Sequence, residues 1–303
     1  MPDVINLAEK YSKKIVDKFY TDSVILGKTS KEYSWDGVKS INVYTLQTVA
    51  PTNYLRPYSD DVENHHVTSA SLSRYGATTE VQDTIQNLPI TQDKAVSLSV
   101  DKGNNTQQML IKNAGVVMAR ELREQFVPMF DKWCLAQWAL NRGGTTIQAS
   151  LTKSNIVEEI FKHVTNIRNE GASVEDAYCY IGETNYALLL RSDEFIQYGG
   201  GEFAGRNIEK GAMGKVRGLT IVPVPDSYLT KSTNTDLPGN VQFMTVKKSV
   251  VLAPTKIKDA KVHQDPPGIS GALLEVRWMY DAFVLETKNK GVQVCLTAEP
   301  SSN

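Results

Sequence analysis

The sequence has little cysteine, no long apolar run and almost no net charge. Its three cysteines, Cys134, Cys179 and Cys295, are far apart and odd in number, which argues against a disulfide framework and favours buried thiols in a reducing compartment. No apolar run approaches the roughly 18 residues needed to span a bilayer. The first twenty residues carry charges every few positions and so lack the apolar core of a signal peptide. We therefore expect neither a membrane segment nor a secretion signal.

The charge balance excludes a strong electrostatic drive toward polyanions. Lys and Arg number 33 against 34 Asp and Glu, which gives a net charge of -1. Such a chain is not drawn strongly to nucleic acid or to an anionic membrane surface. With 303 residues, 41% of them hydrophobic, it is long enough for one or two folded domains.

Recognisable catalytic and metal-binding patterns are also missing. No Cys or second His stands at zinc-ligand spacing, and no G-x-S-x-G elbow offers a serine nucleophile. The carboxylate pair Glu158–Glu159 is adjacent in sequence and is expected to be solvated. The four histidines are adjacent or isolated: His65, His66, His163 and His263. We assign no catalytic, cofactor-binding or metal-binding residue and expect no enzyme.

Two loops resemble binding motifs only superficially. In "DKGNN", counting from Asp101, an EF-hand would need Gly at position 6 and Glu at position 12, where Thr106 and Lys112 stand. Asn104, Asn105 and Thr106 are instead good helix N-caps, so this stretch is predicted to join a strand to a helix. The loop "GGGEFAG" (199–205) has the wrong spacing for a dinucleotide fingerprint and follows a predicted helix.

The first hundred residues predict an arm and a long excursion. Val4, Leu7, Ile15, Val16 and Phe19 suit an amphipathic helix, docked on protein or, as the less favoured alternative, on a membrane surface. Residues 38–49 and 88–100 read as two long strands, the second with Val96, Leu98 and Val100 on one face. The polar stretch between them contains too few apolar residues for a core. Because an isolated hairpin is marginally stable, we expect it to lie on a neighbour.

The strongest pattern is helical, from Thr106 to about Leu140. Apolar residues recur there at spacings of three and four, whereas the charged residues, Asp131 included, mostly occupy the other face. Pro128 is expected to kink or break this helix, because proline removes a backbone donor. Four residues are expected to form its core: Leu122, Phe126, Phe130 and Trp133.

The rest of the chain alternates between helices and strands. Residues 155–171 predict a helix capped by Ser154 and ended by Gly171, and "TNYALLLRSDEFI" predicts another opened by Thr184. "KVHQDPPGISG" reads as a turn-rich excursion. Strands are predicted at "AYCYIG", "GLTIVPVP", "VQFMTVKKSVVLAP" and twice within "ALLEVRWMYDAFVLETKNKGVQVCLTA". The fold class is therefore α+β.

The order of these pieces resembles a known family. "LPITQDKAVSLSVDKGNNTQQ" and "MARELREQFVPMFDKWCLAQWA" carry the resemblance, the second through an internal Pro followed by an acidic residue, here Pro128 and Asp131. "GASVEDAYCYIGETNYALLLRSDEFI" and "GKVRGLTIVPVPDSYL" extend it downstream. Together they resemble the major capsid protein of tailed bacteriophages, with the Hong Kong 97 fold.

The resemblance implies a layout. Residues 1–32 would be the N-terminal arm and 33–100 the extended E-loop. The peripheral domain with its spine helix would comprise 101–170 and 256–303, and the axial domain 171–255. Contacts between subunits are expected in the E-loop and in the glycine-rich loop, at Tyr54, Arg56, Tyr58, Arg74, Tyr75, Gly200 and Phe203.

The resemblance also implies a function and partners. Copies of the chain would form the hexamers and pentamers of an icosahedral virion shell around double-stranded DNA, assembled in the bacterial host cytoplasm. A portal protein and a possible decoration protein would join the shell, and the packaged DNA would make weak, non-specific contacts. An encapsulin, a nanocompartment shell of the same fold, is the alternative, and the long E-loop favours the phage assignment.

Two departures from the family qualify these expectations. Some members begin with a long scaffolding segment that a protease removes. Because only about 30 residues precede the expected E-loop, we expect a separate scaffolding protein. Some members also cross-link neighbouring subunits through a Lys–Asn bond promoted by a Glu, and we assign no such residues here.

Overall fold

The computed structural model describes residues 23–33, 40–52, 54, 75, 78, 80–107, 113–192 and 215–297, with only the backbone described at positions 107 and 215. The chain separates into two compact units, Ser40–Leu88 and the remainder. We call them the hairpin unit and the main body. The expected N-terminal amphipathic helix and the glycine-rich loop 199–205 lie outside the described residues.

The hairpin unit contains two paired strands, β1 (Ser40–Leu46) and β2 (Asp83–Pro89). The backbone N–H of Gln47 donates to the carbonyl oxygen of Gln82 at 2.8 Å. The side chain of Asn87 donates to that of Asn42 at 2.6 Å. The partner residue number falls from 87 to 82 as the position on the first strand rises from 42 to 47, so the two strands are antiparallel. The expectation that 88–100 forms the second strand of the hairpin is wrong from Gln92 onward, because the chain there joins a sheet of the main body.

In the main body, a three-stranded antiparallel sheet has the order β10–β11–β3. Its strands are β3 (Gln92–Asp101), β10 (Thr255–Gln264) and β11 (Gly271–Tyr280). Along β11, buried residues alternate with more exposed ones, the period expected of a sheet covered on one face. Val96, Leu98 and Val100 all contact the hydrophobic clusters beneath it, as the alternation in the sequence predicted.

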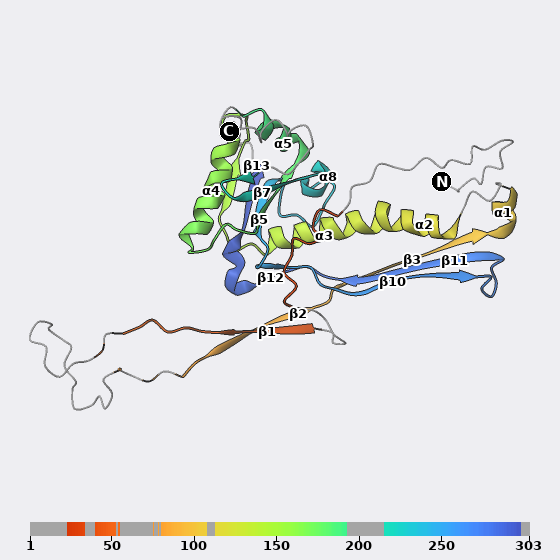
Figure 1. The fold of residues 1–303 in the computed structure, drawn as a ribbon, viewed down its shortest axis with the longest axis horizontal. Helices are drawn as coiled ribbons and strands as arrows, with labels where there is room; N and C mark the ends of the chain where they lie inside the picture. Colours follow the sequence, from red (N-terminus) through yellow and green to blue (C-terminus); the bar gives the residue numbers. More distant parts are fainter. Residues whose placement is uncertain are drawn as a thin grey trace, which may run out of the picture. The chain divides into compact units, whose positions relative to one another are not determined.

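A long helix covers this sheet (Figure 1). It comprises α2 (Ala114–Glu121), the π turn η1 (Leu122–Phe126) and α3 (Val127–Leu140). Pro128 was expected to kink or break this helix, and the helix does not break there. Within the π turn, the N–H of Val127 donates to the carbonyl of Leu122, five residues earlier. This wider turn lies just ahead of the proline, whose missing N–H would disrupt a regular helix, and the helix continues through it.

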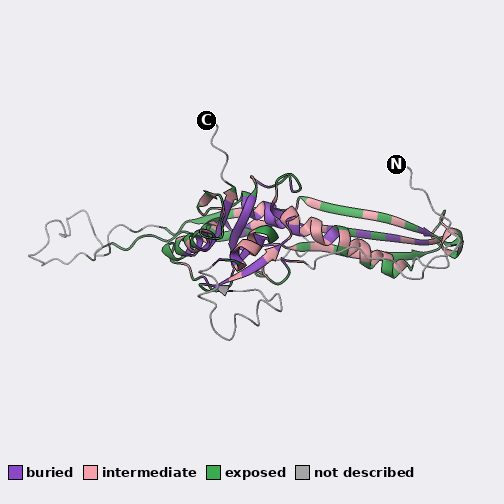
Figure 2. Ribbon diagram, turned by 90° about the horizontal axis from the view of Figure 1, so that it is seen from above, coloured by how far each residue is buried: buried purple, intermediate pink, exposed green. Residues whose placement is uncertain are grey.

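A six-stranded sheet forms the second layer of the main body, in the order β4–β13–β8–β5–β7–β6. The strands are β4 (Thr146–Ala149), β5 (Ala177–Gly182), β6 (Lys215–Val216), β7 (Leu219–Val224), β8 (Val241–Lys247) and β13 (Val292–Thr297). The C-terminal half of α3 packs on one face and α4 (Ile156–Asn169) on the other. Both faces are therefore buried, and Figure 2 shows buried residues concentrated in this sheet.

Short elements complete the main body. They are α1 (Lys102–Gln107), α5 (Glu183–Leu190), α8 (Asp226–Leu229), the 3₁₀ turn η2 (Glu286–Gly291) and the strand pair β9 (Val251–Leu252) with β12 (Phe283–Val284). "DKGNN" joins β3 to α1, as predicted. Gly171, with a φ of 74°, follows the C-terminus of α4 in the left-handed conformation that glycine tolerates.

Several local predictions are wrong. Asn104, Asn105 and Thr106 do not cap a helix but lie inside α1, where the Asp101 carboxylate accepts from the N–H of Asn104. The long helix begins at Ala114, capped by Asn113. The N-cap position of α4 is Asn155 rather than Ser154, and α5 begins at Glu183 rather than after Thr184. The expected excursion "KVHQDPPGISG" is partly the end of β10.

Candidate functional site

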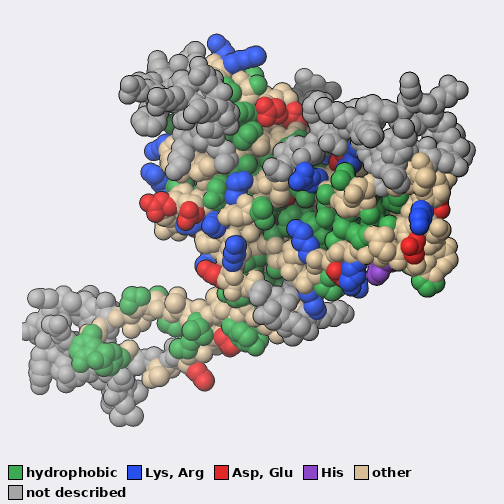
Figure 3. Space-filling model, turned by 45° about the vertical axis from the view of Figure 1, so that its right-hand side comes forward, with side chains coloured by type: hydrophobic (Ala, Val, Ile, Leu, Met, Phe, Trp, Pro, Cys, Tyr) green, Lys and Arg blue, Asp and Glu red, His purple; other side chains and the backbone are tan. Residues whose placement is uncertain are grey.

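The hairpin unit exposes an unusual amount of apolar surface. Exposed large hydrophobic side chains number eleven in the part of the chain that the structure describes, and seven of them belong to this unit. The seven are Tyr44, Leu46, Val49, Tyr54, Tyr75, Val81 and Ile85. Figure 3 shows hydrophobic side chains gathered on the hairpin surface. A concentration of exposed apolar side chains of this kind indicates an interaction site.

Three of these side chains share one face of the hairpin. Asn42 and Asn87 are opposite one another, and side chains two residues apart on a strand share a face. Tyr44, Leu46 and Ile85 therefore lie on the same face as that pair, with exposed fractions of 64%, 69% and 56%. We call these three residues the hairpin strip. The opposite face holds Thr45, Thr84 and Gln86 together with three apolar residues, Ile41, Val43 and Leu88. The two faces therefore differ in exposure, because Val43 and Leu88 are buried whereas the hairpin strip is exposed.

Two of the expected contact residues lie in the described part of the hairpin unit. The rings of Tyr54 and Tyr75 meet edge to face, with centroids 5.1 Å apart, and Tyr75 is 80% exposed. Their role between subunits stays a prediction. The other expected contact residues lie outside the described residues: Arg56, Tyr58, Arg74, Gly200 and Phe203.

The four residues expected in the helix core all face hydrophobic neighbours. Phe126 is buried, whereas Leu122, Phe130 and Trp133 are partly buried and pack against the same cluster. The rings of Phe126 and Phe130 lie 5.4 and 6.3 Å from the ring of Trp278 on β11. These contacts join the helix to the three-stranded sheet.

A buried carboxylate fixes the point where the chain enters β3. Asp281 is 2% exposed. Its Oδ2 accepts hydrogen bonds from the backbone N–H and the hydroxyl of Thr91, both at 2.7 Å. Its Oδ1 accepts from Trp133 Nε1 at 3.0 Å and from the N–H of Ala282 at 2.8 Å. Asp281 thus ties the start of β3 and the helix α3 to the end of β11.

A second buried carboxylate fixes the described N-terminal residues. Asp131 was expected on the charged face of its helix, and that is wrong, because it is fully buried. It accepts hydrogen bonds from the Ser23 hydroxyl at 2.7 Å and from the Val24 N–H at 2.9 Å. Burial raises its pKa to about 6, against the lowering effects of these hydrogen bonds and of Lys28. The apolar periodicity gave no sign of this residue, whereas the Pro-x-x-Asp pattern singled it out.

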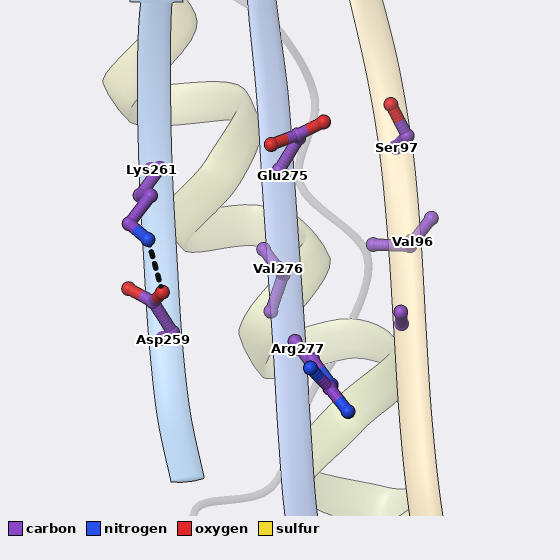
Figure 4. A pocket seen from close by; sticks show the side chains of 8 residues that line it. Val96, Ser97, Asp259, Lys261, Glu275, Val276 and Arg277 are labelled. Atoms are coloured by element: carbon purple, nitrogen blue, oxygen red, sulfur yellow. Dashed lines mark ion pairs between the residues drawn. The ribbon is translucent and has the colours of Figure 1, made fainter.

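The outer face of the three-stranded sheet is polar and holds a shallow groove of about 510 Å³. Figure 4 shows Arg277 extending from β11 toward β3, where it forms two hydrogen bonds with Asp93, at 3.0 and 2.6 Å. This hydrogen bonding holds the pKa of Asp93 below its ordinary value. Lys261 pairs with Asp259 at 2.7 Å along β10. These charges neutralise one another at an exposed surface, so each pair contributes little to stability.

A polar contact is also buried between α4 and the six-stranded sheet. The Nδ1 of His163 lies 3.0 Å from the hydroxyl oxygen of Thr245 on β8. Burial lowers its pKa to about 3, so the ring is neutral. Its neighbour Glu159 is buried, contrary to the expectation of a solvated pair, and only Glu158 is exposed. The three cysteines are buried and free, as predicted.

Chemical sites are scarce in the described ranges. Among those residues, no group of three or more His, Cys, Asp or Glu side chains could hold a metal ion. No helix of the described part is long and apolar enough to cross a membrane. The features that remain are surfaces and anchors, and the hairpin strip is one of these surfaces.

Sequence comparisons find no relative. No model of a known protein family matches the chain, and no curated protein matches it either.

Comparisons of structure are decisive for the fold. The capsid structure of cyanophage P-SCSP1u is 15% identical and superposes with a TM-score of 0.72 over 97% of this chain and 93% of that chain. The mature capsid of bacteriophage PhiM1 is 15% identical, with a TM-score of 0.67 over 97% and 93%. The chain has the fold of a phage capsid protein. The head structure of Helicobacter pylori bacteriophage KHP40 shows the same capsid fold at 10% identity, with a TM-score of 0.69 over 96% of this chain and 95% of that chain.

Proposed function

We propose that the chain is the major capsid protein of a tailed bacteriophage, a structural protein and not an enzyme. Copies of it assemble into the hexamers and pentamers of an icosahedral shell that encloses double-stranded DNA. The observation that carries this proposal is the capsid fold, which extends over nearly the whole chain. The exposed apolar surface of the hairpin unit supports it independently, because such surface requires a partner.

In this proposal the hairpin unit is the E-loop and the helix from α2 to α3 is the spine helix. The hairpin strip docks on a neighbouring subunit, because two strands alone cannot bury these side chains. The peripheral domain contains the spine helix and the three-stranded sheet, and the axial domain contains the six-stranded sheet. Interlocked interfaces of this kind bury more than about 2,000 Å² each. Many such contacts, repeated around a shell, resist the pressure of packaged DNA.

The partners follow from the same proposal. The chain is nearly neutral, so its contacts with packaged DNA are weak and non-specific. A separate scaffolding protein guides assembly, a portal protein occupies one vertex, and a decoration protein is a further partner of the outer surface. Assembly takes place in the cytoplasm of the bacterial host, and the product resides in the virion.

The contents of native particles test this function. Particles containing the chain are purified from producing cells and treated with nuclease, and the protected nucleic acid and the accompanying proteins are identified. Protected double-stranded DNA of uniform length supports the phage capsid. Particles that hold an enzyme and no DNA indicate the nanocompartment alternative. Recovery of the chain only as small oligomers contradicts both.

A further inference from the structure

The residues before the hairpin form an anchored segment, Ser23–Ser30, in the main body. Val24 and Ile25 are 7% and 1% exposed and belong to the hydrophobic core shared by α3 and the six-stranded sheet. At the other end, the N–H of Ser30 donates to the carbonyl of Val251 at 3.0 Å. Leu26, by contrast, is 81% exposed. The segment is thus held at both ends, and the chain N-terminal to it departs from a fixed point.

Asp131 makes the first of these two attachments. One carboxylate oxygen accepts from the Ser23 hydroxyl, and the other accepts from the Val24 N–H. Lys28 folds back on the segment, and its Nζ donates to the carbonyl of Val24 at 2.6 Å. The segment itself therefore covers the carboxylate and removes it from water. A buried carboxylate pays a desolvation penalty that its neutral acid does not.

The hydrogen-bond geometry accommodates both protonation states of Asp131. When the acid is neutral, its O–H can donate to Ser23 Oγ, because a hydroxyl both donates and accepts. The Val24 N–H then still donates to the remaining carbonyl oxygen. Both contacts therefore persist after protonation. In the contact with Ser23 the donor becomes Asp131 instead of the serine, and the buried charge is removed. Opening of the segment exposes the carboxylate to water. This removes the desolvation cost of the ionised form, whereas the neutral acid has little such cost to lose, so the ionised form favours opening.

We propose that Asp131 is a protonation-controlled anchor, which holds the Ser23–Lys28 end of the segment more tightly when neutral than when ionised. The anchor regulates how firmly the N-terminal arm is attached to the main body. It is a property of the single subunit and does not depend on the proposed shell function.

The sign of the pH effect follows from linkage. The folded pKa of Asp131 is raised from 3.8 to about 6. The closed segment therefore binds a proton that the opened segment releases between these two values. Closure is strongest at acidic pH and weakens as the pH rises through 6. From the two pKa values, the closing equilibrium falls about tenfold between pH 5 and pH 7 and little further above it.

Four titratable side chains around Asp131, those of Lys28, Cys134, Tyr180 and Tyr228, keep one protonation state in this window. Lys28 is cationic. Burial lowers its pKa from the ordinary value of 10.5, and the nearby Asp131 carboxylate partly offsets this lowering. Burial raises the pKa of the thiol of Cys134 and of the phenols of Tyr180 and Tyr228, so all three stay neutral. Two further charged side chains lie in this region: Lys132, whose ammonium is 5.7 Å from the centroid of the Tyr228 ring, and Asp281, which like Asp131 acts on the Cys134 thiol.

Hydrogen–deuterium exchange of the full-length chain tests the anchor, because the Val24 N–H is itself one of the bonds. Exchange of a peptide spanning residues 23–30 is measured from pH 5 to pH 7 and expressed relative to the intrinsic rate at each pH. Asp131→Asn mimics the neutral acid, since its amide can donate to Ser23 and accept from Val24. Asp93→Asn is the matched control, an exposed carboxylate on the outer sheet face.

The wild type and Asp93→Asn are expected to lose about tenfold in protection between pH 5 and pH 7, whereas Asp131→Asn stays protected throughout. Wild-type protection that is flat or that rises with pH overturns the proposal, even where the variant does not fold. So does an Asp131→Asn profile with the wild-type slope.

Discussion

The indole Nε1 of Trp133 donates a hydrogen bond to Oδ1 of Asp281 at 3.0 Å. The same carboxylate holds Thr91 through its other oxygen, so one buried charge joins the long helix to the start of β3. Because Thr91 follows the hairpin unit by three residues, this contact fixes the main-body end of the segment that leads to the hairpin. Trp133 therefore has two roles, apolar packing against the helix–sheet cluster and satisfaction of a buried charge.

Truncation of Trp133 separates these two roles. Trp133→Phe removes one hydrogen bond to a buried carboxylate, which costs about 1.5–3 kcal/mol. Trp133→Ala also removes the packing, and the cost is expected to reach about 3–5 kcal/mol. Urea unfolding of the purified chain measures both, with the neighbouring Lys132→Ala as the control expected to stay near wild type. A Trp133→Ala change within error would mean that this side chain is not part of the core.

The hairpin strip is expected to matter for assembly and not for the stability of the subunit. Replacement of Tyr44, Leu46 and Ile85 together by Thr keeps good strand formers in place and removes the exposed apolar face. Substitutions of exposed residues typically change stability by less than about 0.5 kcal/mol each, whereas shell yield is expected to fall at least tenfold. Sedimentation of expressed particles measures the yield.

The opposite face of the same hairpin provides the matched control for the strip. Conversion of Thr45, Thr84 and Gln86 to Ser is expected to leave the shell yield within twofold of wild type. Equal losses from both triple variants would show that the hairpin backbone, rather than the strip, makes the contact.

Deletion of residues 50–78 tests the E-loop assignment. These residues belong to the hairpin unit, and the described hydrophobic core of the main body does not include them. The shortened chain is expected to be a soluble, folded subunit that forms no closed shells. Circular dichroism and size-exclusion chromatography establish folding, and electron microscopy establishes assembly. Closed shells from this variant would show that the assignment is wrong.

His163 predicts a pH dependence of stability. Its pKa in the folded chain is lowered from 6.5 to about 3. Between these values His163 is protonated in the unfolded chain and neutral in the folded chain. Stability is therefore lost as the pH falls, by about 1.4 kcal/mol per pH unit between roughly 6 and 4. His163→Gln is expected to lack this contribution, and denaturant unfolding across the range measures the difference in slope.

Two comparisons make the His163 test specific. Asn166→Ala changes a non-titrating residue on the same helix and is expected to lower stability equally at every pH. The raised pKa of Asp131 makes the folded state more stable as the pH falls from 6 to 3.8, which opposes the effect of His163. Because Asp131 is present in every variant, its contribution cancels in the comparison of slopes. Parallel slopes for wild type and His163→Gln would contradict the buried, neutral state of the ring.

The sequence predicted long, periodic elements well and their junctions poorly. The apolar period of the long helix and the alternation of Val96, Leu98 and Val100 both reflect burial on one face, which a sequence pattern records directly. The pairing of β3 with β11 joins residues about 180 positions apart, and no local pattern records it. The Pro128 break failed because a π turn accommodates the proline, and a propensity rule does not include that adjustment.

The buried polar residues were the hardest part of the site to predict. Asp131 and Glu159 are charged, and charge normally places a residue in water. What reverses this for Asp131 is a pair of donors more than a hundred residues away, at Ser23 and Val24. The hairpin strip, in contrast, follows from a simple argument, since a segment that cannot form its own core must expose its apolar face until a partner covers it.

The most direct test of the central claim is electron microscopy of the chain expressed alone and then together with a candidate scaffolding protein. We predict closed shells of uniform diameter, with scaffolding protein improving their uniformity. A monodisperse small oligomer under every condition would contradict the assignment of the chain as a capsid protein, despite its capsid fold.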